Sequence, residues 1–380
     1  MEPCQKDQAG LEVGATCVTK GASDPELNQG VIPVRDGFGF DYAALTRWME
    51  AHVEGFQGPL TVYEFRGGQS NPTYKLVTPG KTYVLRRKPF GDLIAGAHAV
   101  DREARILLAL GATGFPVARV YGVCLDEDVI GSWFYIMDMV EGRIFWDATF
   151  ASVPADRRPP YFSAMNDTLA RLHQIDAAAI GLADFGRGEN YLARQISRWT
   201  RSYLSDSDAG RDAGMDWLIE FLPNAIPDSD ESAIVHGDYR CDNMIFHPTE
   251  PKIVAVLDWE LSTLGHPLAD FTYHAMMYRM PPQIVAGLGD VDPASLNIPT
   301  EAEYVEQYCA ATGRRSIPNY EFFIACSAAC SARAFRMAAI FHGIKGRVVR
   351  GSAASAHSAQ RVQHYPVLVK LAVDAAKACA

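Results

Sequence analysis

The chain has 380 residues, of which 48% are hydrophobic, and a formal net charge of −10. This length allows one large domain or two modest ones with a substantial core. The acidic balance argues against a nucleic-acid-binding protein, which would carry a basic surface. Residues 1–30 are polar, mixed in charge and without an apolar segment, so we expect a disordered tail and no signal peptide.

The cysteines and the hydropathy pattern indicate where in the cell the protein is expected. The eight cysteines include no Cys-x-x-Cys pair and no zinc-finger-like pattern with histidine, so free thiols are favoured over disulfides and zinc. No uncharged apolar stretch is long enough to cross a membrane. We therefore expect a cytoplasmic protein with neither a membrane nor a nucleic-acid partner.

Residues 31–140 have the pattern of a β-rich lobe with one principal helix. Asp41 can cap a short helix that carries Leu45 and Met49 on its apolar face. A second helix, over about 100–110, carries Glu103. Strands are predicted, in chain order, at 61–66, 73–77, 81–88, 117–123 and 133–140. Together these elements form the smaller of two predicted lobes.

Residues 141–380 are mainly helical by pattern and form the larger predicted lobe. Helices are predicted over 161–174, 319–341 and 354–378. The polar residues 205–216 are predicted to form a loop, and the Gly-flanked stretch 343–352 a connection between two long helices. The fold class is therefore α+β, with the lobes meeting at Glu141-Gly142.

One stretch of the larger lobe has the residue types and spacing of a phosphoryl-transfer site. It reads His236-Gly237-Asp238-Tyr239-Arg240-Cys241-Asp242-Asn243 and continues, after a short apolar segment, to Leu257-Asp258-Trp259-Glu260. Such a site uses one Asp to accept the hydroxyl proton and an Asn, after four intervening residues, to bind magnesium. A second Asp, at the next strand end, binds magnesium at the phosphates. Asp238, Asn243 and Asp258 match these three positions.

The apolar segments 244–246 and 253–257 indicate how these residues meet. They are typical of a β-hairpin, which would return Asp258 to the cavity that Asp238 and Asn243 face. Two carboxylates and an amide oxygen make a hard-oxygen site suited to magnesium. The plainer alternative is that the Asp residues are turn and cap residues. The joint spacing favours the phosphoryl-transfer interpretation.

The phosphates need cations and backbone amides, and the smaller lobe can supply both. Gly67-Gly68-Gln69-Ser70-Asn71 lies between two predicted strands, where small residues let amides approach anionic oxygens. On the strand at 81–88, alternation places Arg86 and Lys88 on one face. We assign the phosphate contact to Arg86, held by Glu103, with Lys88 as the competing choice.

Three further segments carry a family resemblance: Gly67-Gly68-Gln69-Ser70-Asn71-Pro72-Thr73-Tyr74, Tyr83-Val84-Leu85-Arg86-Arg87-Lys88-Pro89, and Tyr191-Leu192-Ala193-Arg194-Gln195-Ile196-Ser197-Arg198-Trp199. With residues 236–243, they resemble the aminoglycoside phosphotransferase and choline kinase-like family, which has the two-lobed protein-kinase-like fold. Within that family, the chain is more similar to the kinase-like domain fused to some acyl-CoA dehydrogenases and to free-standing bacterial relatives.

This resemblance implies an ATP- and magnesium-dependent kinase that phosphorylates the hydroxyl of a small molecule. A hydroxyacyl-CoA or a hydroxy acid is the implied acceptor, with a functional link to an acyl-CoA dehydrogenase. It also implies that Asp270 supports the catalytic loop, and the position of His236 before Gly237-Asp238 favours a structural role for that ring too. Two alternatives stay open: an aminoglycoside-type antibiotic kinase, and a non-catalytic nucleotide-binding module linked to acyl-CoA dehydrogenation.

The acceptor would be anionic if it carried coenzyme A or a carboxylate. The stretch 343–352 contains three cations in an otherwise acidic chain. A stretch of this kind most often forms a solvent-exposed connection between helices. The sharper interpretation is that Arg347 or Arg350 faces the cleft and binds the acceptor's negative charge.

Overall fold

The fold was obtained as a computed structural model, which describes residues 30–66, 71–90, 98–282, 284, 287–330, 335–351 and 362–379. Side chains are described over these residues except at 326–330 and 335–337. The predicted tail up to residue 29 and four residues of the predicted phosphate loop, Gly67-Gly68-Gln69-Ser70, lie outside the described residues. None of the described helices combines the length and the apolar character needed to cross a membrane.

The N-terminal lobe is built on an antiparallel sheet. Its strands are β1 (Val31–Ile32), β2 (Thr61–Phe65), β3 (Thr73–Val77), β4 (Thr82–Arg87), β5 (Val120–Cys124) and β6 (Phe134–Asp138). Their order across the sheet is β1-β2-β3-β4-β6-β5, and every adjacent pair is antiparallel. The five predicted strands are confirmed, most with shorter bounds, and β1 was not predicted.

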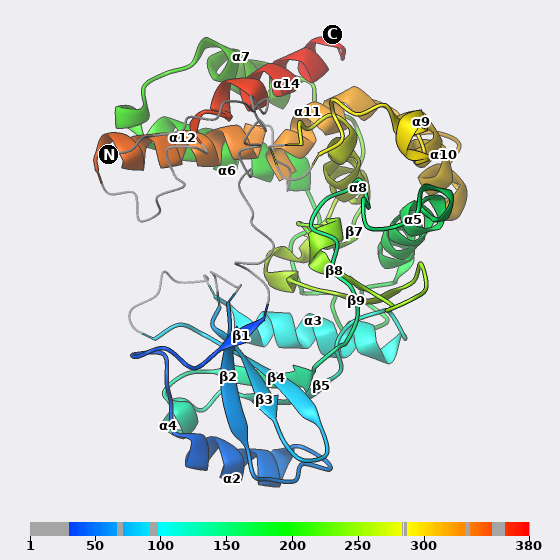
Figure 1. The fold of residues 1–380 in the computed structure, drawn as a ribbon. Helices are drawn as coiled ribbons and strands as arrows, with labels where there is room; N and C mark the ends of the chain where they lie inside the picture. The colour runs from blue at the N-terminus through cyan, green and yellow to red at the C-terminus, as the bar shows by residue number, and fades with distance from the viewer. Residues whose placement is uncertain are drawn as a thin grey trace, which may run out of the picture.

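The two faces of this sheet pack against different helices, which Figure 1 shows on opposite sides of it. On one face, Leu85 of β4 packs in a cluster with Leu45 of α2 (Tyr42–His52). On the other face, Tyr135 of β6 belongs to a much larger cluster that includes the buried side of α3 (Val100–Ala112) and continues into the C-terminal lobe. The alternation of side chains along each strand therefore divides the lobe between two hydrophobic clusters.

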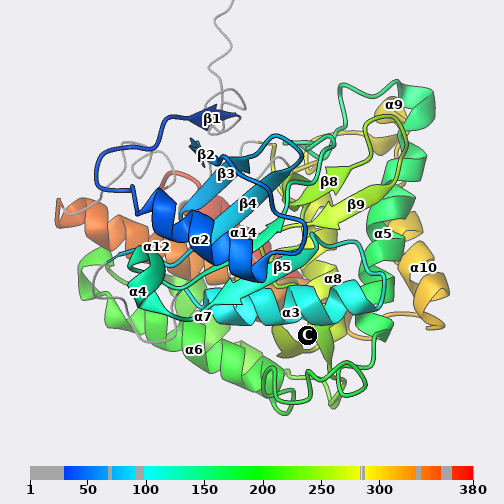
Figure 2. The same cartoon turned by 90° about the horizontal axis from the view of Figure 1, so that it is seen from below.

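Helices make up most of the C-terminal lobe, which lies above the sheet in Figure 1. They are α5 (Pro159–Gln174), α6 (Tyr191–Ser205), α7 (Ala213–Phe221), α8 (Pro267–Ala275), α9 (Pro293–Leu296), α10 (Glu301–Thr312), α11 (Tyr320–Cys330), α12 (Phe335–Val349) and α14 (Tyr365–Lys377), while α4 (Glu127–Ile130) belongs to the N-terminal lobe. Figure 2 shows α5 and α10 side by side at one edge of the molecule.

Two small antiparallel pairs of strands lie where the lobes meet. Strand β7 (Ala233–Val235) pairs with β10 (Thr263–Gly265), and β8 (Met244–Phe246) pairs with β9 (Ile253–Val256). The second pair confirms the predicted hairpin. The sequence-based α+β class, with a β-rich N-terminal lobe and a mainly helical C-terminal lobe, is confirmed as well.

The chain passes from β6 to the C-terminal lobe beside this hairpin. Arg143 and Phe246 exchange two backbone hydrogen bonds of 2.8 Å. A Cβ atom added at Gly142 would lie 2.2 Å from the carbonyl oxygen of Phe246 and 2.4 Å from a methyl of Ile245. Gly142 therefore permits an approach between the connection and the hairpin that no larger residue allows.

The stretch 343–352, predicted to be a connection, is helical as far as Val349, so that prediction is wrong. Gly346 explains the error. A Cβ atom added at Gly346 would lie 2.2 to 2.4 Å from the carboxylate atoms of Asp206, so only glycine leaves room for that carboxylate. The glycine thus admits a neighbouring side chain and does not break the helix.

Two other predicted boundaries also need correction. The single helix predicted over 319–341 is two helices, α11 and α12, with 331–334 outside the described residues. The predicted loop 205–216 ends early, because Asp212 caps α7 by accepting hydrogen bonds from the N–H groups of Gly214 and Met215. An Asp in a polar stretch signals a helix start as readily as a loop.

Candidate active site

Helix α8 holds the start of the loop 236–243 through one buried carboxylate. Asp270 accepts hydrogen bonds from the backbone N–H of His236 at 2.7 Å and from that of Gly237 at 2.9 Å. Nε2 of His173 lies 3.3 Å from the same carboxylate. Burial works to raise the pKa of Asp270, but the hydrogen bonds and His173 outweigh it and lower the pKa. Asp270 therefore anchors the loop as an ionised group, the structural role expected for it.

The ring of His236 spans the site beneath the loop. Nδ1 accepts a hydrogen bond from the N–H of Asp238 at 3.1 Å, and Nε2 donates to the carbonyl of Leu257 at 2.8 Å. Both nitrogens are thereby occupied, which confirms the structural role predicted for this histidine. Gly237 takes a left-handed backbone conformation with φ of +83°, and a Cβ atom there would lie 2.9 Å from the carbonyl oxygen of Leu261.

The structure brings Asp238 and Asn243 into direct contact. Nδ2 of Asn243 donates to Oδ2 of Asp238 at 3.0 Å and to its carbonyl oxygen at 2.9 Å. Because the amide nitrogen faces Asp238, the amide oxygen of Asn243 points to the other side of the group. That oxygen is the atom that a magnesium ion would use. The Asp238 side chain is 25% exposed, so a substrate can reach it.

The hairpin of β8 and β9 brings Asp258 to the same region. The N–H of Leu257 donates to the carbonyl of Asn243 at 2.8 Å, which ties the strand end to the loop. Asp258 itself has a left-handed backbone, with φ of +64°, before a short 3-10 helix, Trp259–Leu261. Such a conformation is uncommon for a residue other than glycine and is often found at functional sites. It turns the Asp258 carboxylate towards the N-terminal lobe, where it meets Arg86.

Arg86 of β4 lies among three carboxylates from two segments: Glu103 of α3, and Asp258 and Glu260 after β9. Nε donates to Glu103 at 2.8 Å, Nη2 donates to Asp258 at 3.2 Å, and Nη2 lies 3.8 Å from Glu260. The pair predicted between Arg86 and Glu103 is therefore present. Burial works to lower the pKa of Arg86, but these carboxylates outweigh it and raise the pKa, so the guanidinium stays charged. Burial raises the pKa of Glu103 despite this partner.

The side chain of Lys88, the competing cation, lies against Trp133. Its Nζ lies 3.9 Å from the ring centroid of Trp133, and its backbone N–H donates to the carbonyl of the same residue at 3.0 Å. A cation over an indole ring is held by a favourable contact with the ring's electrons. The structure thus places Arg86, and not Lys88, between Glu103 and Asp258.

The donor set of this region fits magnesium. Carboxylate oxygens of Glu103, Asp258 and Glu260 lie within 4.8 Å of one another. The amide oxygen of Asn243 is directed away from Asp238, as the hydrogen bonds of its nitrogen require. Carboxylate and amide oxygens are the ligands that magnesium prefers, together with water and substrate phosphates. Asp258 and Asn243 are the residues that would hold the ion.

Two residues at this site were not assigned from the sequence. The hydroxyl of Tyr273, on α8, donates a hydrogen bond to Oδ1 of Asp238. Arg240 pairs with Asp242, and its Nε lies 3.7 Å from Oδ1 of Asp238. The sequence signal for Tyr273 is its spacing: it lies three residues after Asp270, and residues three apart share a helix face, but this spacing does not identify the contact with Asp238.

The remaining predicted binding residues lie as follows. Asn71 is buried, and its Oδ1 lies 3.0 Å from Nδ1 of His98. Arg347 is in the exposed last turn of α12. Arg350 binds Asp206 at 2.7 Å and Asp208 at 2.8 Å. An acceptor would have to draw Arg350 away from both carboxylates, so its acceptor role stays a prediction.

Comparison with known proteins agrees with this geometry. Residues 61–323 match the phosphotransferase enzyme family (APH). The chain is 42% identical over 343 residues to acyl-CoA dehydrogenase family member 11 of Gallus gallus, a match that covers 87% of this chain and 43% of the relative. The chain therefore spans less than half of the length of that relative.

Solved structures share the whole fold. A proposed aminoglycoside phosphotransferase of Ralstonia eutropha is 45% identical, with a TM-score of 0.82, over 90% of this chain and 99% of the other. A spectinomycin phosphotransferase in complex with ADP and spectinomycin is 11% identical, with a TM-score of 0.58, over 90% and 99% of the two chains. At that identity, the likeness concerns the fold alone.

The chain belongs to the phosphotransferase enzyme family. Membership supports small-molecule kinase activity, and the curated relatives confirm the predicted likeness to acyl-CoA dehydrogenase family members.

Proposed function

We propose that this protein transfers the γ-phosphoryl group of ATP, with magnesium, to the hydroxyl of a small molecule, and that the acceptor is a hydroxyacyl-CoA or a hydroxy acid. The observation that carries the phosphotransferase proposal is the contact between Asp238 and Asn243 at a loop tied to Asp258. A proton acceptor and two magnesium ligands in one polar region are the parts that phosphoryl transfer requires.

Each residue has a distinct task in this proposal. Asp238 orients the acceptor hydroxyl and takes its proton. Asn243 and Asp258 hold magnesium, which supplies positive charge at the phosphates. Rate enhancement comes mainly from alignment of the reactants and from groups, already in position, that stabilise the charge of the transition state. The anchoring of the loop by Asp270 and His236 keeps Asp238 in position for this task.

Arg86 contacts the nucleotide phosphates while Glu103 continues to hold its Nε. Its Nη2 donates to Asp258 in the structure described here. With magnesium bound to Asp258, the same nitrogen can turn to a phosphate oxygen, for which a guanidinium is well suited. The segment Gly67-Gly68-Gln69-Ser70-Asn71 covers the phosphates from the N-terminal lobe in this proposal.

The acceptor proposal is supported by the relatives. The matching part of several curated relatives is one portion of a protein named as an acyl-CoA dehydrogenase family member. A kinase next to a dehydrogenase of acyl-CoA suggests a shared substrate class, a coenzyme A thioester. We therefore propose a functional link to an acyl-CoA dehydrogenase, in which phosphorylation of a hydroxyl precedes removal of that oxygen.

The experiment is a panel of acceptors with Mg-ATP. Hydroxyacyl-CoAs with the hydroxyl at different positions, the matching free hydroxy acids and several aminoglycosides are incubated with the enzyme. Mass spectrometry then detects phosphorylated product, with Asp238→Asn as the inactive control. A phosphorylated hydroxyacyl-CoA is the expected product. Product from aminoglycosides alone would overturn the acceptor proposal, and product from no acceptor, with no Mg-ATP binding, would overturn the kinase proposal.

Arg347 near the end of α12 and Arg350 just after it test the anionic acceptor directly. If Arg347 or Arg350 binds the acceptor, its replacement by Ala raises the Michaelis constant for a hydroxyacyl-CoA more than that for ATP. Added salt narrows the difference, because it screens the charge. Unchanged acceptor kinetics in both variants would leave Arg350 with the role of pairing Asp206 and Asp208.

A further inference from the structure

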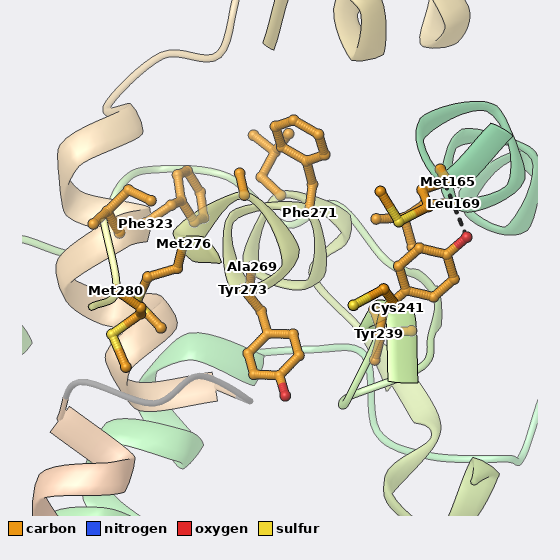
Figure 3. Packing of buried hydrophobic residues seen from close by; sticks show 14 of the residues in the cluster. Met165, Leu169, Tyr239, Cys241, Ala269, Phe271, Tyr273, Met276, Met280 and Phe323 are labelled. Carbon is orange, nitrogen blue, oxygen red and sulfur yellow. Dashed lines mark hydrogen bonds between the residues drawn. The ribbon is translucent and has the colours of Figure 1, made fainter. Parts of the chain in front are cut away.

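The hydroxyl of Tyr273 lies against the proposed catalytic carboxylate. Figure 3 shows its ring projecting from α8 on the side opposite to Phe271. The side chain is 4% exposed, and its hydroxyl donates a hydrogen bond to Oδ1 of Asp238. The same helix anchors the loop through Asp270, one turn earlier. The position of the phenol is therefore set by the element that also sets the position of Asp238.

This hydrogen bond is of the same kind as the one that a substrate alcohol would make with Asp238. A phenol is protonated at neutral pH, whereas an ionised carboxylate can only accept hydrogen bonds. Tyr273 is therefore the donor and Asp238 the acceptor. The acceptor hydroxyl of a kinase makes the same O–H to carboxylate hydrogen bond before transfer. An alcohol group of the protein thus makes the contact that the substrate alcohol needs.

The surroundings of Asp238 limit where that substrate hydroxyl can bind. Oδ2 of Asp238 accepts a hydrogen bond from Nδ2 of Asn243, which is also a proposed magnesium ligand. Oδ1 faces Tyr273, with Nε of Arg240 at 3.7 Å. A hydroxyl that approaches Asp238 from the exposed side therefore competes with Tyr273 at Oδ1.

We propose that, in the enzyme without acceptor, the hydroxyl of Tyr273 occupies the place on Asp238 that the acceptor hydroxyl takes during transfer, and so keeps water from being activated there. This inference rests on the proposed function. Tyr273 then determines specificity for alcohols over water. A small water molecule gains little from displacing the phenol, whereas an acceptor bound elsewhere in the cleft can displace it.

The reaction that Tyr273 suppresses is ATP hydrolysis. In that reaction, the oxygen of water bonds to the γ-phosphorus, the bond from this phosphorus to the oxygen of ADP breaks, and Asp238 takes a proton from the water. The products are ADP, phosphate and a proton released to solvent. Loss of one competing hydrogen bond is expected to raise this rate about fivefold.

The test uses the whole protein with Mg-ATP and no acceptor, and measures ADP release. Tyr273→Phe is expected to hydrolyse ATP about fivefold faster than the wild type. Adding Asp238→Asn to this variant is expected to abolish the gain. Tyr273→His, whose ring N–H can donate to Asp238, is expected to restore part of the suppression. Tyr278→Phe is the matched control, because the buried hydroxyl of Tyr278 has no hydrogen-bond partner in the described structure.

The outcomes separate this inference from the function on which it rests. If the wild type binds Mg-ATP but Tyr273→Phe hydrolyses it no faster, or more slowly, the inference is overturned and the kinase proposal stands. If the wild type neither binds Mg-ATP nor phosphorylates any acceptor, the kinase proposal fails and the inference with it. Thermal unfolding of Tyr273→Phe at the wild-type temperature would show that a gain in hydrolysis does not come from a damaged fold.

Discussion

Arg86 donates a hydrogen bond to Asp258 across 172 positions of sequence, from the central sheet of one lobe to the hairpin of the other. The same guanidinium is bound by Glu103 of α3. The proposed phosphate-binding cation is therefore in direct contact with a proposed magnesium ligand.

Replacement of Arg86 tests this relationship. In Arg86→Ala, the Michaelis constant for ATP rises and turnover falls, each by roughly ten- to a hundredfold, because the phosphates lose a charge-assisted hydrogen bond. The free energy of unfolding falls by about 3 kcal/mol, because Glu103 is left buried without its partner. Steady-state kinetics and urea unfolding measure the two effects.

Lys88→Ala is the matched control for Arg86→Ala. Its ammonium lies over Trp133 and away from Asp258, so nucleotide kinetics are expected to change little. If Lys88→Ala did the greater damage to the Michaelis constant for ATP, the assignment of the phosphate contact to Arg86 would be wrong.

The division of labour between the two aspartates is a second prediction. Asp238→Ala abolishes turnover but leaves the affinity for Mg-ATP nearly intact, because this residue handles the acceptor. Asp258→Ala weakens Mg-ATP binding itself, because it removes a magnesium ligand. Titration calorimetry with Mg-ATP distinguishes the two variants. Normal turnover in Asp238→Ala would contradict its role as the proton acceptor.

A third prediction concerns the close approach at Gly142. Gly142→Ala places a methyl group 2.2 Å from the carbonyl oxygen of Phe246, so the connection and the hairpin must separate. We expect a loss of about 1–3 kcal/mol in the free energy of unfolding, typical of overpacking. Gly80→Ala is the control, because nothing lies within 4 Å of its added methyl. Equal stability of the two variants would show that the connection adapts freely.

A fourth prediction concerns two buried histidines, His266 and His274. Burial lowers the pKa of each from 6.5 to about 4. The unfolded chain therefore binds these protons at a higher pH than the folded chain does. Their contribution to stability is complete above the unfolded pKa and is lost as the pH falls from about 6.5 to about 4, at up to about 3 kcal/mol per residue.

The substitution His274→Gln isolates one of the two. The wild-type ring contacts the carbonyl of Tyr239 at 3.2 Å and the hydroxyl of Tyr304 at 2.7 Å, and an uncharged amide can replace both contacts. Urea unfolding of both proteins across this pH range measures the slope of stability against pH. The variant is expected to have the shallower slope, and equal slopes would show that His274 is not the titrating group.

The central part of the site was predictable because it is local in sequence. Asp238, Asn243 and Asp258 lie within 21 positions of one another, and a hairpin, whose pattern is visible in the sequence, brings them together. The contact of Tyr273 with Asp238 depends on how α8 docks on the loop, which no local pattern specifies. Their hydrogen bond belongs to tertiary packing and needed the structure.

The cations at and just after the end of α12 show the opposite case, in which a local pattern misled. Glycines among three cations favoured an exposed connection, because glycine usually interrupts helices. The reason for Gly346 is a carboxylate 140 positions away, that of Asp206, which packs against the helix at this point. Asp206 also pairs with Arg350. Charge and composition could not identify this partner, because neither indicates which distant segment packs against the helix.

The hydrophobic cluster that includes α3 has a consequence for how the molecule unfolds. Although α3 precedes the connection between the lobes, its apolar side belongs to the same cluster as the helices of the C-terminal lobe, and Phe115 just after it contacts Trp259. Denaturation of either lobe would expose apolar surface of the other. We therefore expect the two lobes to unfold together, and a fragment cut at the connection would leave α3 without most of the surface that buries it.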